Sequence, residues 1–239
     1  ISYSIMIMKH SKILLGCPTS GYHEYALKEY AEAVKRLTYK NRDILLVDNS
    51  KDDSYLKKLE KYDLSAVKGP WFESAKQRII KSRNLLREKA LEGNYDYLLS
   101  LEQDIIPPKD IIENLLKHKH DIVSALYFMP SDSSLTPMLA IKEKDQYGYI
   151  PFNYADKNNS TINVNYAGLG CILISKKVLQ KIKFRADKKP GFDDWWFCKD
   201  AEKEGFKIYA DLSVKCKHLI KNRPWSWKDI KVWTQIQKF

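Results

Sequence analysis

The sequence predicts an α/β fold: a mostly parallel central sheet with helices on both faces and a small antiparallel portion. Short apolar segments alternate with helical segments along the first half of the chain, which is typical of a parallel sheet. Residues 131–161 are instead polar and aromatic, which favours loops and short antiparallel strands. The 239 residues suffice for a large core, and no linker interrupts them, so we expect one domain over 1–239.

Periodicity and turn residues place the individual elements. In the first half we expect strands at 12–17, 43–47, 97–104 and 121–127, with helices at 24–37, 55–62, 74–91 and from 108 onward. In the second half we expect a strand at 171–174, helices from 176 and 194, and strands near 208 and 214.

Charge and cysteine content narrow the function classes. A net charge of +11 and a pI near 9.3 predict attraction to polyanions such as phosphorylated substrates, nucleic acid or an acidic membrane face. The four cysteines lie far apart without a CxxC pair, so we expect buried thiols in a reducing compartment. The apolar stretches are too short to span a bilayer. The unpaired cysteines thus predict a cytoplasmic location, with membrane association as an alternative.

Two acids end the apolar run at 97–104. Because side chains alternate along a strand, Leu98, Ser100, Glu102 and Asp104 are expected on one face. Both carboxylates would then leave the sheet at its carboxyl edge, where open α/β sheets bind ligands. Such a site suits a divalent cation held against a diphosphate. The alternative is that both acids are solvated turn residues.

Polar residues also end the first two strands, as Pro18 and Thr19 and as Asp48 and Asn49. At the carboxyl edge they could meet a nucleoside, or they could only shape turns. Arg83 lies on the helical stripe that should face the core. A buried guanidinium needs a carboxylate or phosphate partner, so a structural salt bridge competes with ligand binding.

The segment from 191 to 198 contains Asp193, Asp194, Trp195 and Trp196. Either aspartate could cap the following helix, but the small residues at helical spacing behind Asp194 predict an inward carboxylate. Adjacent tryptophans cannot both be buried on one helix face, so we expect at least one to border a cleft and meet a sugar ring. Further on, alternation places His218 on an apolar strand face, either as a core residue or as a metal ligand.

Taken together, these segments resemble the nucleotide-sugar-dependent glycosyltransferases of the GT-A fold, closest to the family 2 type. The resemblance runs from Ile13 to about His218 and rests on six segments in the family's order: ILLGCPTSGYHEY, ILLVDNSKDDS, AKQRIIKSRNLLRE, DYLLSLEQD, NYAGLGCILISKKVLQKI and FDDWWFCKDAEKEGFKIYADLSVKCKH.

The resemblance implies roles for individual residues. Nucleotide binding would fall to Pro18, Thr19, Glu24, Asp48, Asn49 and Arg83, the metal to Asp104, Glu102 and His218, and the sugars to Gly168, Gly170, Trp195 and Trp196. Asp194, beside Asp193, would be the catalytic base. The chain departs from the family pattern in reading Glu-Gln-Asp at the metal motif and Asp193-Asp194 at the usual Glu-Asp pair, and Ser20 and Gly21 lengthen the first loop.

The expected activity is therefore transfer of a sugar from a nucleoside-diphosphate sugar to an acceptor hydroxyl or lipid phosphate, assisted by Mn²⁺ or Mg²⁺. The metal and Arg83 would stabilise the leaving diphosphate, and Asp194 would deprotonate the acceptor, with inversion at the anomeric carbon. We expect a nucleotide-binding part at about 12–127 and an acceptor and catalytic part at about 128–220.

The C-terminal segment at about 224–239 is basic and rich in tryptophan, with apolar residues every three positions. A helix there could lie on a membrane surface, or it could pack on the domain. Two rival functions are a nucleic-acid-binding module and a sugar-phosphate nucleotidyltransferase. The sequence has no RNA- or DNA-binding motif and no glycine- and arginine-rich first loop, so we expect no nucleic-acid partner.

Overall fold

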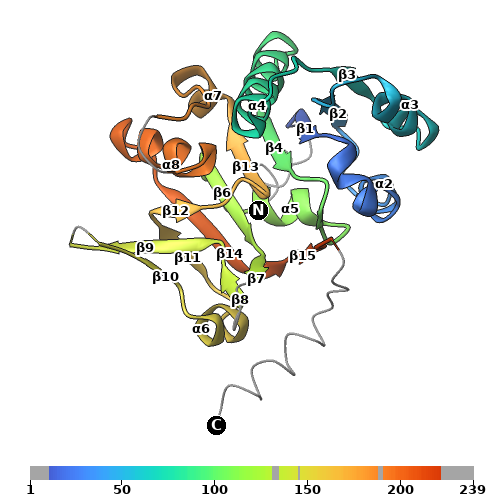
Figure 1. Cartoon of the computed structure of the whole chain (residues 1–239). Coiled ribbons are helices and arrows are strands. Elements are labelled where there is room, and N and C mark those ends of the chain that lie inside the picture. Colours follow the sequence, from blue (N-terminus) through green and yellow to red (C-terminus); the bar gives the residue numbers. More distant parts are fainter. Residues whose placement is uncertain (1–10, 131–134, 145, 188–190, 222–239) are drawn as a thin grey trace.

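The computed structural model describes residues 11–130, 135–144, 146–187 and 191–221. An eight-stranded sheet crosses the molecule in the order β11-β14-β6-β13-β4-β1-β2-β3 (Figure 1). Its strands are β1 (Ile13–Thr19), β2 (Arg42–Asp48), β3 (Ala66–Lys68), β4 (Tyr97–Leu101), β6 (Ile122–Leu126), β11 (Thr161–Val164), β13 (Cys171–Ser175) and β14 (Ile208–Lys215).

Helices and short strands complete the described chain. The helices are the 3₁₀ helix η1 (Gly21–Ala26), α2 (Leu27–Lys35), α3 (Ser54–Lys61), α4 (Ala75–Glu92), α5 (Ile111–Leu116), α6 (Phe152–Lys157), α7 (Lys176–Lys181) and α8 (Asp193–Lys203). The short strands are β5 (Ile105–Ile106), β7 (Phe128–Pro130), β8 (Leu135–Pro137), β9 (Leu139–Glu143), β10 (Gln146–Tyr149), β12 (Tyr166–Ala167) and β15 (Lys217–His218).

The direction of the strands confirms the predicted mixed α/β fold with a mostly parallel central sheet. Strands β3, β2, β1 and β4 are parallel neighbours, and β14 runs parallel to β6. Strand β13 is antiparallel to both β4 and β6, and Cys171 at its start pairs with Leu101 at the end of β4. The chain therefore enters β13 from the carboxyl edge of β4, which brings residues 168–170 to that edge.

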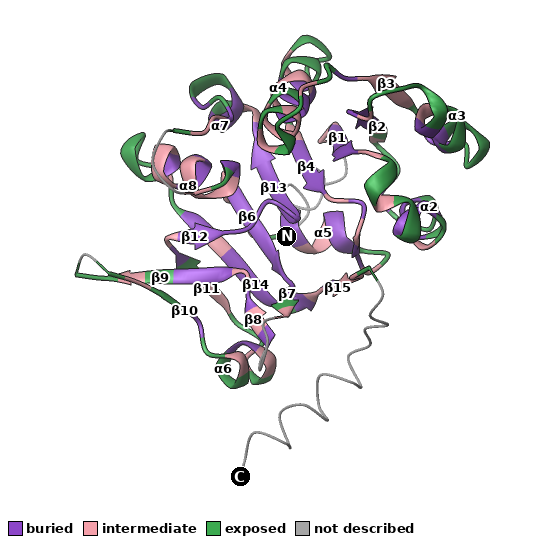
Figure 2. Ribbon diagram, viewed as in Figure 1, coloured by how far each residue is buried: buried purple, intermediate pink, exposed green. Residues whose placement is uncertain are grey.

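Alternating side chains give the sheet two buried faces. On β4, Leu98 belongs to the core under α4, α7 and α8, whereas Leu99 belongs to the core under α2, α3 and α5. Figure 2 shows the central strands almost continuously buried between these helices. Strands buried on both faces read as continuous apolar runs, as in Tyr97–Leu101.

Several expected boundaries were wrong. The strand expected at 97–104 ends at Leu101, and a turn in which Ile105 N donates to Glu102 O follows it. The alternation argument for Glu102 and Asp104 therefore fails beyond Leu101. The helix expected at 24–37 begins as η1, and the strands expected near 208 and 214 are one strand, β14. Strand β3 and helix α6 were not expected.

Further expectations concern the cysteines, membrane-spanning helices and the C-terminal segment. All four cysteines are free and buried, as the composition predicted. Within the described residues, no helix is both long and apolar enough to cross a membrane. The predicted C-terminal helix at about 224–239 lies outside the described residues.

Candidate active site

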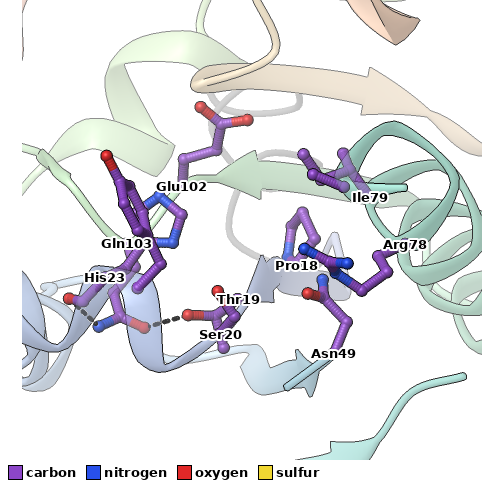
Figure 3. A pocket seen from close by; sticks show the side chains of 11 residues that line it. Pro18, Thr19, Ser20, His23, Asn49, Arg78, Ile79, Glu102 and Gln103 are labelled. Atoms are coloured by element: carbon purple, nitrogen blue, oxygen red, sulfur yellow. Dashed lines mark hydrogen bonds between the residues drawn. The ribbon is translucent and has the colours of Figure 1, made fainter. Parts of the chain in front are cut away.

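The carboxyl ends of β1 and β2 and the start of α4 enclose a cavity of about 430 Å³, called here the smaller cavity. Figure 3 shows Arg78 and Ile79 projecting from α4 on one side and His23 and Gln103 on the other. Among the residues predicted from sequence, the lining includes Pro18, Thr19, Asn49 and Glu102.

Three other predicted nucleotide contacts, Asp48, Glu24 and Arg83, lie outside this lining, and Arg83 lines the larger cavity described below. The carboxylate of Asp48 is fully buried, 3.1 Å from the ammonium of Lys68, and accepts a hydrogen bond from the backbone N–H of Ser50. Glu24 is exposed and pairs with Lys58 at 2.7 Å. Their contact with a nucleotide remains a prediction.

The smaller cavity has residues that sequence reasoning missed. The side-chain amide of Gln103 bonds to Thr19 and donates to the backbone oxygen of His23 at 2.9 Å, which ties β1, η1 and the β4 turn together. Arg78 lies over the ring of Trp71, 4.3 Å from its centroid, and lines the cavity as its one arginine among the described residues. Arg78 precedes Arg83 by five residues on α4, which at 3.6 residues per turn places the two side chains about 140° apart around the helix. The stripe that contains Arg83 therefore gave no signal for Arg78.

A larger cavity of about 580 Å³ adjoins the smaller one, and both are lined by Ile79 and Glu102. The larger cavity brings together Asp104, Asp194 and His218, three residues that lie far apart in the sequence. The resemblance had assigned the metal to Asp104 and His218 and the catalytic base to Asp194, and the structure places all three around one cavity. The other predicted site residues that line it are Glu102, Arg83, Asp193 and Trp195.

Asp104 and His218 form the first polar group of this cavity. His218 Nε2 lies 3.4 Å from Asp104 Oδ2, while Nδ1 lies 2.9 Å from the backbone oxygen of Phe128 and so donates to it. Burial opposes the charged form of both groups, but their mutual attraction prevails: it lowers the pKa of Asp104 and raises the pKa of His218. His23 Nε2 approaches the same oxygen at 3.9 Å.

Arg83 joins the second polar group. Its guanidinium donates to Asp193, to Glu102 and, at 2.8 Å, to the hydroxyl of Ser100, and only 4% of its side chain is exposed. Burial, together with the neighbouring carboxylates Asp104 and Asp193, raises the pKa of Glu102 although Arg83 opposes the shift. Arg83 thus pairs with the carboxylates of Asp193 and Glu102 inside the larger cavity. We call Arg83, Asp193 and Ser100 the cavity floor.

Asp193 and Asp194 begin α8, but neither caps it, because the N-cap residue is Phe192 and no side chain makes a cap bond. Asp193 is buried against Arg83, whereas Asp194 Oδ2 accepts a hydrogen bond of 2.6 Å from the hydroxyl of Tyr166. Burial raises the pKa of Asp194, and the bond from Tyr166 offsets part of that rise. Sequence reasoning missed Tyr166, although it stands in the quoted segment NYAGLGC.

The two tryptophans lie in different surroundings, although the resemblance assigned both to sugar binding. Trp195 lines the larger cavity, and its ring lies edge-on to Tyr147 with centroids 4.6 Å apart. Trp196 lies under the guanidinium of Arg185 at 4.6 Å and does not line the cavity. Its indole N–H is buried without a partner among the described residues.

Gly168 and Gly170 serve the packing of Tyr127, which itself lines the larger cavity. A Cβ atom on Gly168 would overlap the Tyr127 hydroxyl, and one on Gly170 would lie 2.8 Å from it. The Tyr127 hydroxyl also accepts a hydrogen bond of 3.0 Å from the backbone N–H of Gly170. Neither glycine is a lining residue, so their predicted contact with the donor sugar remains a prediction.

No group of three or more His, Cys, Asp or Glu side chains in the described ranges is arranged to hold a metal ion. The residues nevertheless suit a divalent cation that completes its shell from a ligand. Asp104 Oδ1 is buried without a partner among the described residues, and the imidazole of His218 stands beside it. A carboxylate with an imidazole suits Mn²⁺, and cations at phosphate sites commonly take only one or two protein carboxylates.

Comparison with known proteins yields structural neighbours only. No family model matches the chain, and no curated protein matches its sequence. Among solved structures, A197 from STIV has a TM-score of 0.51 at 20% identity, covering 89% of this chain and 87% of that one. GalNAc-T7, solved with UDP, GalNAc and Mn²⁺, has a TM-score of 0.64 at 12% identity, covering 95% of this chain and 48% of that one.

The mannosyltransferase PcManGT from Pyrobaculum calidifontis, solved with GDP-Man and Mn²⁺, has a TM-score of 0.59 at 14% identity. The match covers 90% of this chain and 59% of that one, so this chain spans about half to three-fifths of the length of these two neighbours. At such identities the likeness shows the fold alone. The chain has the mixed α/β, Rossmann-like architecture of GT-A proteins.

Proposed function

We propose that this protein is a glycosyltransferase that moves a sugar from a nucleoside-diphosphate sugar to an acceptor hydroxyl or lipid phosphate. One observation carries the proposal: Asp104, His218 and Asp194 line one cavity, which adjoins a second cavity at the carboxyl edge of β1 and β2. The neighbours solved with UDP and Mn²⁺ or with GDP-Man and Mn²⁺ support it through their shared fold. The motif order further favours a family 2-like enzyme.

The two cavities suggest separate roles within one catalytic domain, nucleoside binding in the smaller cavity and catalysis in the larger one. The smaller cavity, between β1, β2 and α4, would take the nucleoside, and Asp48 would support the loop beneath it. Residues at about 12–127 thus form the nucleotide-binding part and those at about 128–220 the acceptor and catalytic part. Asp104 and His218, with Glu102 nearby, would hold Mn²⁺ or Mg²⁺, which when bound neutralises charge on the leaving diphosphate.

The residues of the larger cavity then supply the rest of the chemistry. Asp194 would accept the proton of the acceptor hydroxyl, a contribution of about 10²–10⁴-fold for a positioned base. A raised pKa suits this role, because a more basic carboxylate takes the proton more readily. Arg83 and Asp193 would hold the floor in place. Attack from the face opposite the leaving group predicts inversion at the anomeric carbon.

A thermal-shift panel tests the proposal. UDP, GDP, ADP and CDP, together with their common sugar conjugates, are added with and without Mn²⁺. A ligand that binds the native state raises its melting temperature by mass action. We expect one base to stabilise the protein, and Mn²⁺ to increase that stabilisation. Mass spectrometry with the stabilising sugar nucleotide should then show release of the nucleoside diphosphate.

Absence of stabilisation by every nucleotide would contradict the proposal. Formation of a sugar nucleotide from a sugar phosphate and a nucleoside triphosphate, with release of pyrophosphate, would instead establish a nucleotidyltransferase. Salt-sensitive retention on RNA or DNA without nucleotide binding would establish a nucleic-acid-binding module.

A further inference from the structure

An aromatic wall stands beside Asp194 in the larger cavity. We use this name for Tyr149, Tyr166, Phe192 and Trp195, which all line the cavity. The Tyr149 and Tyr166 rings meet edge-on with centroids 6.2 Å apart, and the Tyr166 and Trp195 centroids lie 6.1 Å apart. Tyr149 and Phe192 remain 57% and 65% exposed, so the wall is a contiguous aromatic surface with area open to a ligand.

The wall is assembled from three separate parts of the chain. Tyr149 comes from the β9–β10 hairpin, which extends away from the sheet in Figure 1, Tyr166 from β12, and Trp195 from α8. Strand β9 pairs with β12, and Ala167 in β12 bonds to Cys198 in α8. The aromatic rings are therefore held in place by the scaffold.

The charge of the larger cavity is opposite to that of the chain as a whole. Four carboxylates line it, and Arg83 is already paired with two of them; His218 is the other basic lining residue. None of its described lining residues is a lysine, although the chain carries a net charge of +11. A phosphate entering beside Asp194 would face the like charges of Asp193 and Asp194. The proposed cation beside Asp104 would already be engaged by the leaving diphosphate.

Two lysines approach the aromatic wall from outside the lining, but each is engaged. The Lys199 ammonium lies 5.2 Å from the Trp195 centroid, donates to the Tyr147 hydroxyl at 2.6 Å and lies 3.6 Å from Glu202. The Lys76 ammonium donates to the backbone oxygen of Gly191. Both contacts anchor the wall and leave the interior of the cavity acidic.

We propose that the acceptor is an uncharged glycan whose terminal ring stacks on Trp195 and Tyr149, with one hydroxyl directed at Asp194. This inference rests on the proposed function and decides between its two acceptor classes. A sugar ring has an apolar face of C–H groups that suits an aromatic surface, and hydroxyls that suit carboxylates. A lipid phosphate would need a basic pocket, which the larger cavity does not provide.

A binding assay distinguishes the two classes. The protein, loaded with Mn²⁺ and the nucleoside diphosphate that stabilises it most, is applied to an array of uncharged, sialylated and phosphorylated glycans and to vesicles containing a polyprenyl phosphate. We expect retention on uncharged glycans. Tyr149→Ala and Trp195→Ala should each weaken it about tenfold or more, the usual cost of truncating an aromatic anchor.

Matched variants separate stacking from folding. Trp195→Phe keeps a ring and should restore most of the binding. Tyr154→Ala removes another exposed tyrosine, from α6 and outside the cavity lining, and should leave glycan binding unchanged. The melting-temperature rise with nucleotide, measured on each variant, shows that the protein is folded and that the nucleotide site is intact.

Each other outcome overturns the inference. Preferential retention on phosphorylated glycans or on polyprenyl phosphate vesicles would contradict it, as would unchanged binding by Tyr149→Ala and Trp195→Ala. Failure to retain any uncharged glycan while nucleotide still stabilises the protein would remove the inference and leave the proposed function standing. If no nucleotide stabilises the protein, both the acceptor inference and the proposed glycosyltransferase function are wrong.

Discussion

The hydroxyl of Tyr166 donates a 2.6 Å hydrogen bond to Oδ2 of Asp194. The other oxygen, Oδ1, accepts the backbone N–H of Trp195 at 2.7 Å, so both carboxylate oxygens are fixed. Burial raises the pKa of Asp194, and these two hydrogen bonds limit that rise by stabilising the ionised form. Tyr166 thereby positions the proposed base and tunes its basicity.

Replacing Tyr166 tests this relationship. Tyr166→Phe removes a bond that favours the ionised carboxylate, so the pKa of Asp194 should rise further above its usual range. A base acts in its ionised form, and the acidic limb of the pH–rate profile should therefore move to higher pH. The rate of nucleoside diphosphate release, followed across pH, measures the shift. Tyr154→Phe is the control, and an unmoved limb in Tyr166→Phe would show that the bond does not govern the base.

Replacing Asp104 tests the metal site. Asp104→Asn removes the charge of the carboxylate that stands between His218 and His23, so the stabilisation that Mn²⁺ adds to nucleotide binding should disappear. Binding of Mn²⁺ can be followed directly by its electron paramagnetic resonance signal. Asp110→Asn, at an exposed position before α5, should bind Mn²⁺ like the unchanged protein. Undiminished Mn²⁺ binding by Asp104→Asn would place the cation elsewhere.

Replacing Arg83 tests the cavity floor. Arg83→Met leaves the buried carboxylate of Asp193 without its partner, and removing one member of a buried ion pair costs about 3–5 kcal/mol. Urea denaturation measures the free energy of unfolding. Arg185→Met breaks the pair with Asp200, but 42% of the Arg185 side chain is exposed, so about 1 kcal/mol or less is expected. Equal losses in the two variants would refute a special role for Arg83.

A double-mutant cycle tests the packing of Gly168 against Tyr127. Gly168→Ala should destabilise by about 1–3 kcal/mol because its methyl group overlaps the hydroxyl. Tyr127→Phe should cost about 1–3 kcal/mol because the Gly170 N–H loses its acceptor. Since Phe lacks the hydroxyl that the methyl group would overlap, the double variant should lose less stability than the two single variants combined. Strict additivity would mean that the two residues do not interact.

The sequence predicted the fold class because apolar runs and helical periodicity are local properties. Strands β2, β6 and β13 begin and end within about one residue of expectation for this reason. The direction of β13 was not accessible in this way, because it depends on where the chain leaves β12. The short strand β3 and helix α6 have too few residues to establish a period.

In the candidate site, too, residues in local sequence patterns could be predicted, whereas contacts between distant elements could not. Asp104, Asp194 and His218 could be proposed because acids and a histidine stood at expected strand and helix ends. The contact of Asp193 with Arg83 depends on packing across 110 residues of sequence, and no local pattern contains it. Tyr166 and Gln103 were missed for the same reason: their partners, Asp194 and Thr19, come from other elements.

The most direct test of the account is the substitution Asp194→Asn, assayed with the sugar nucleotide and Mn²⁺ that stabilise the unchanged protein. Asparagine keeps the shape of the side chain but cannot take a proton, so sugar transfer should be abolished while nucleotide binding, measured by calorimetry, stays nearly the same. Equal loss of binding and transfer would show that Asp194 is a structural residue, and undiminished transfer would show that the base is another group.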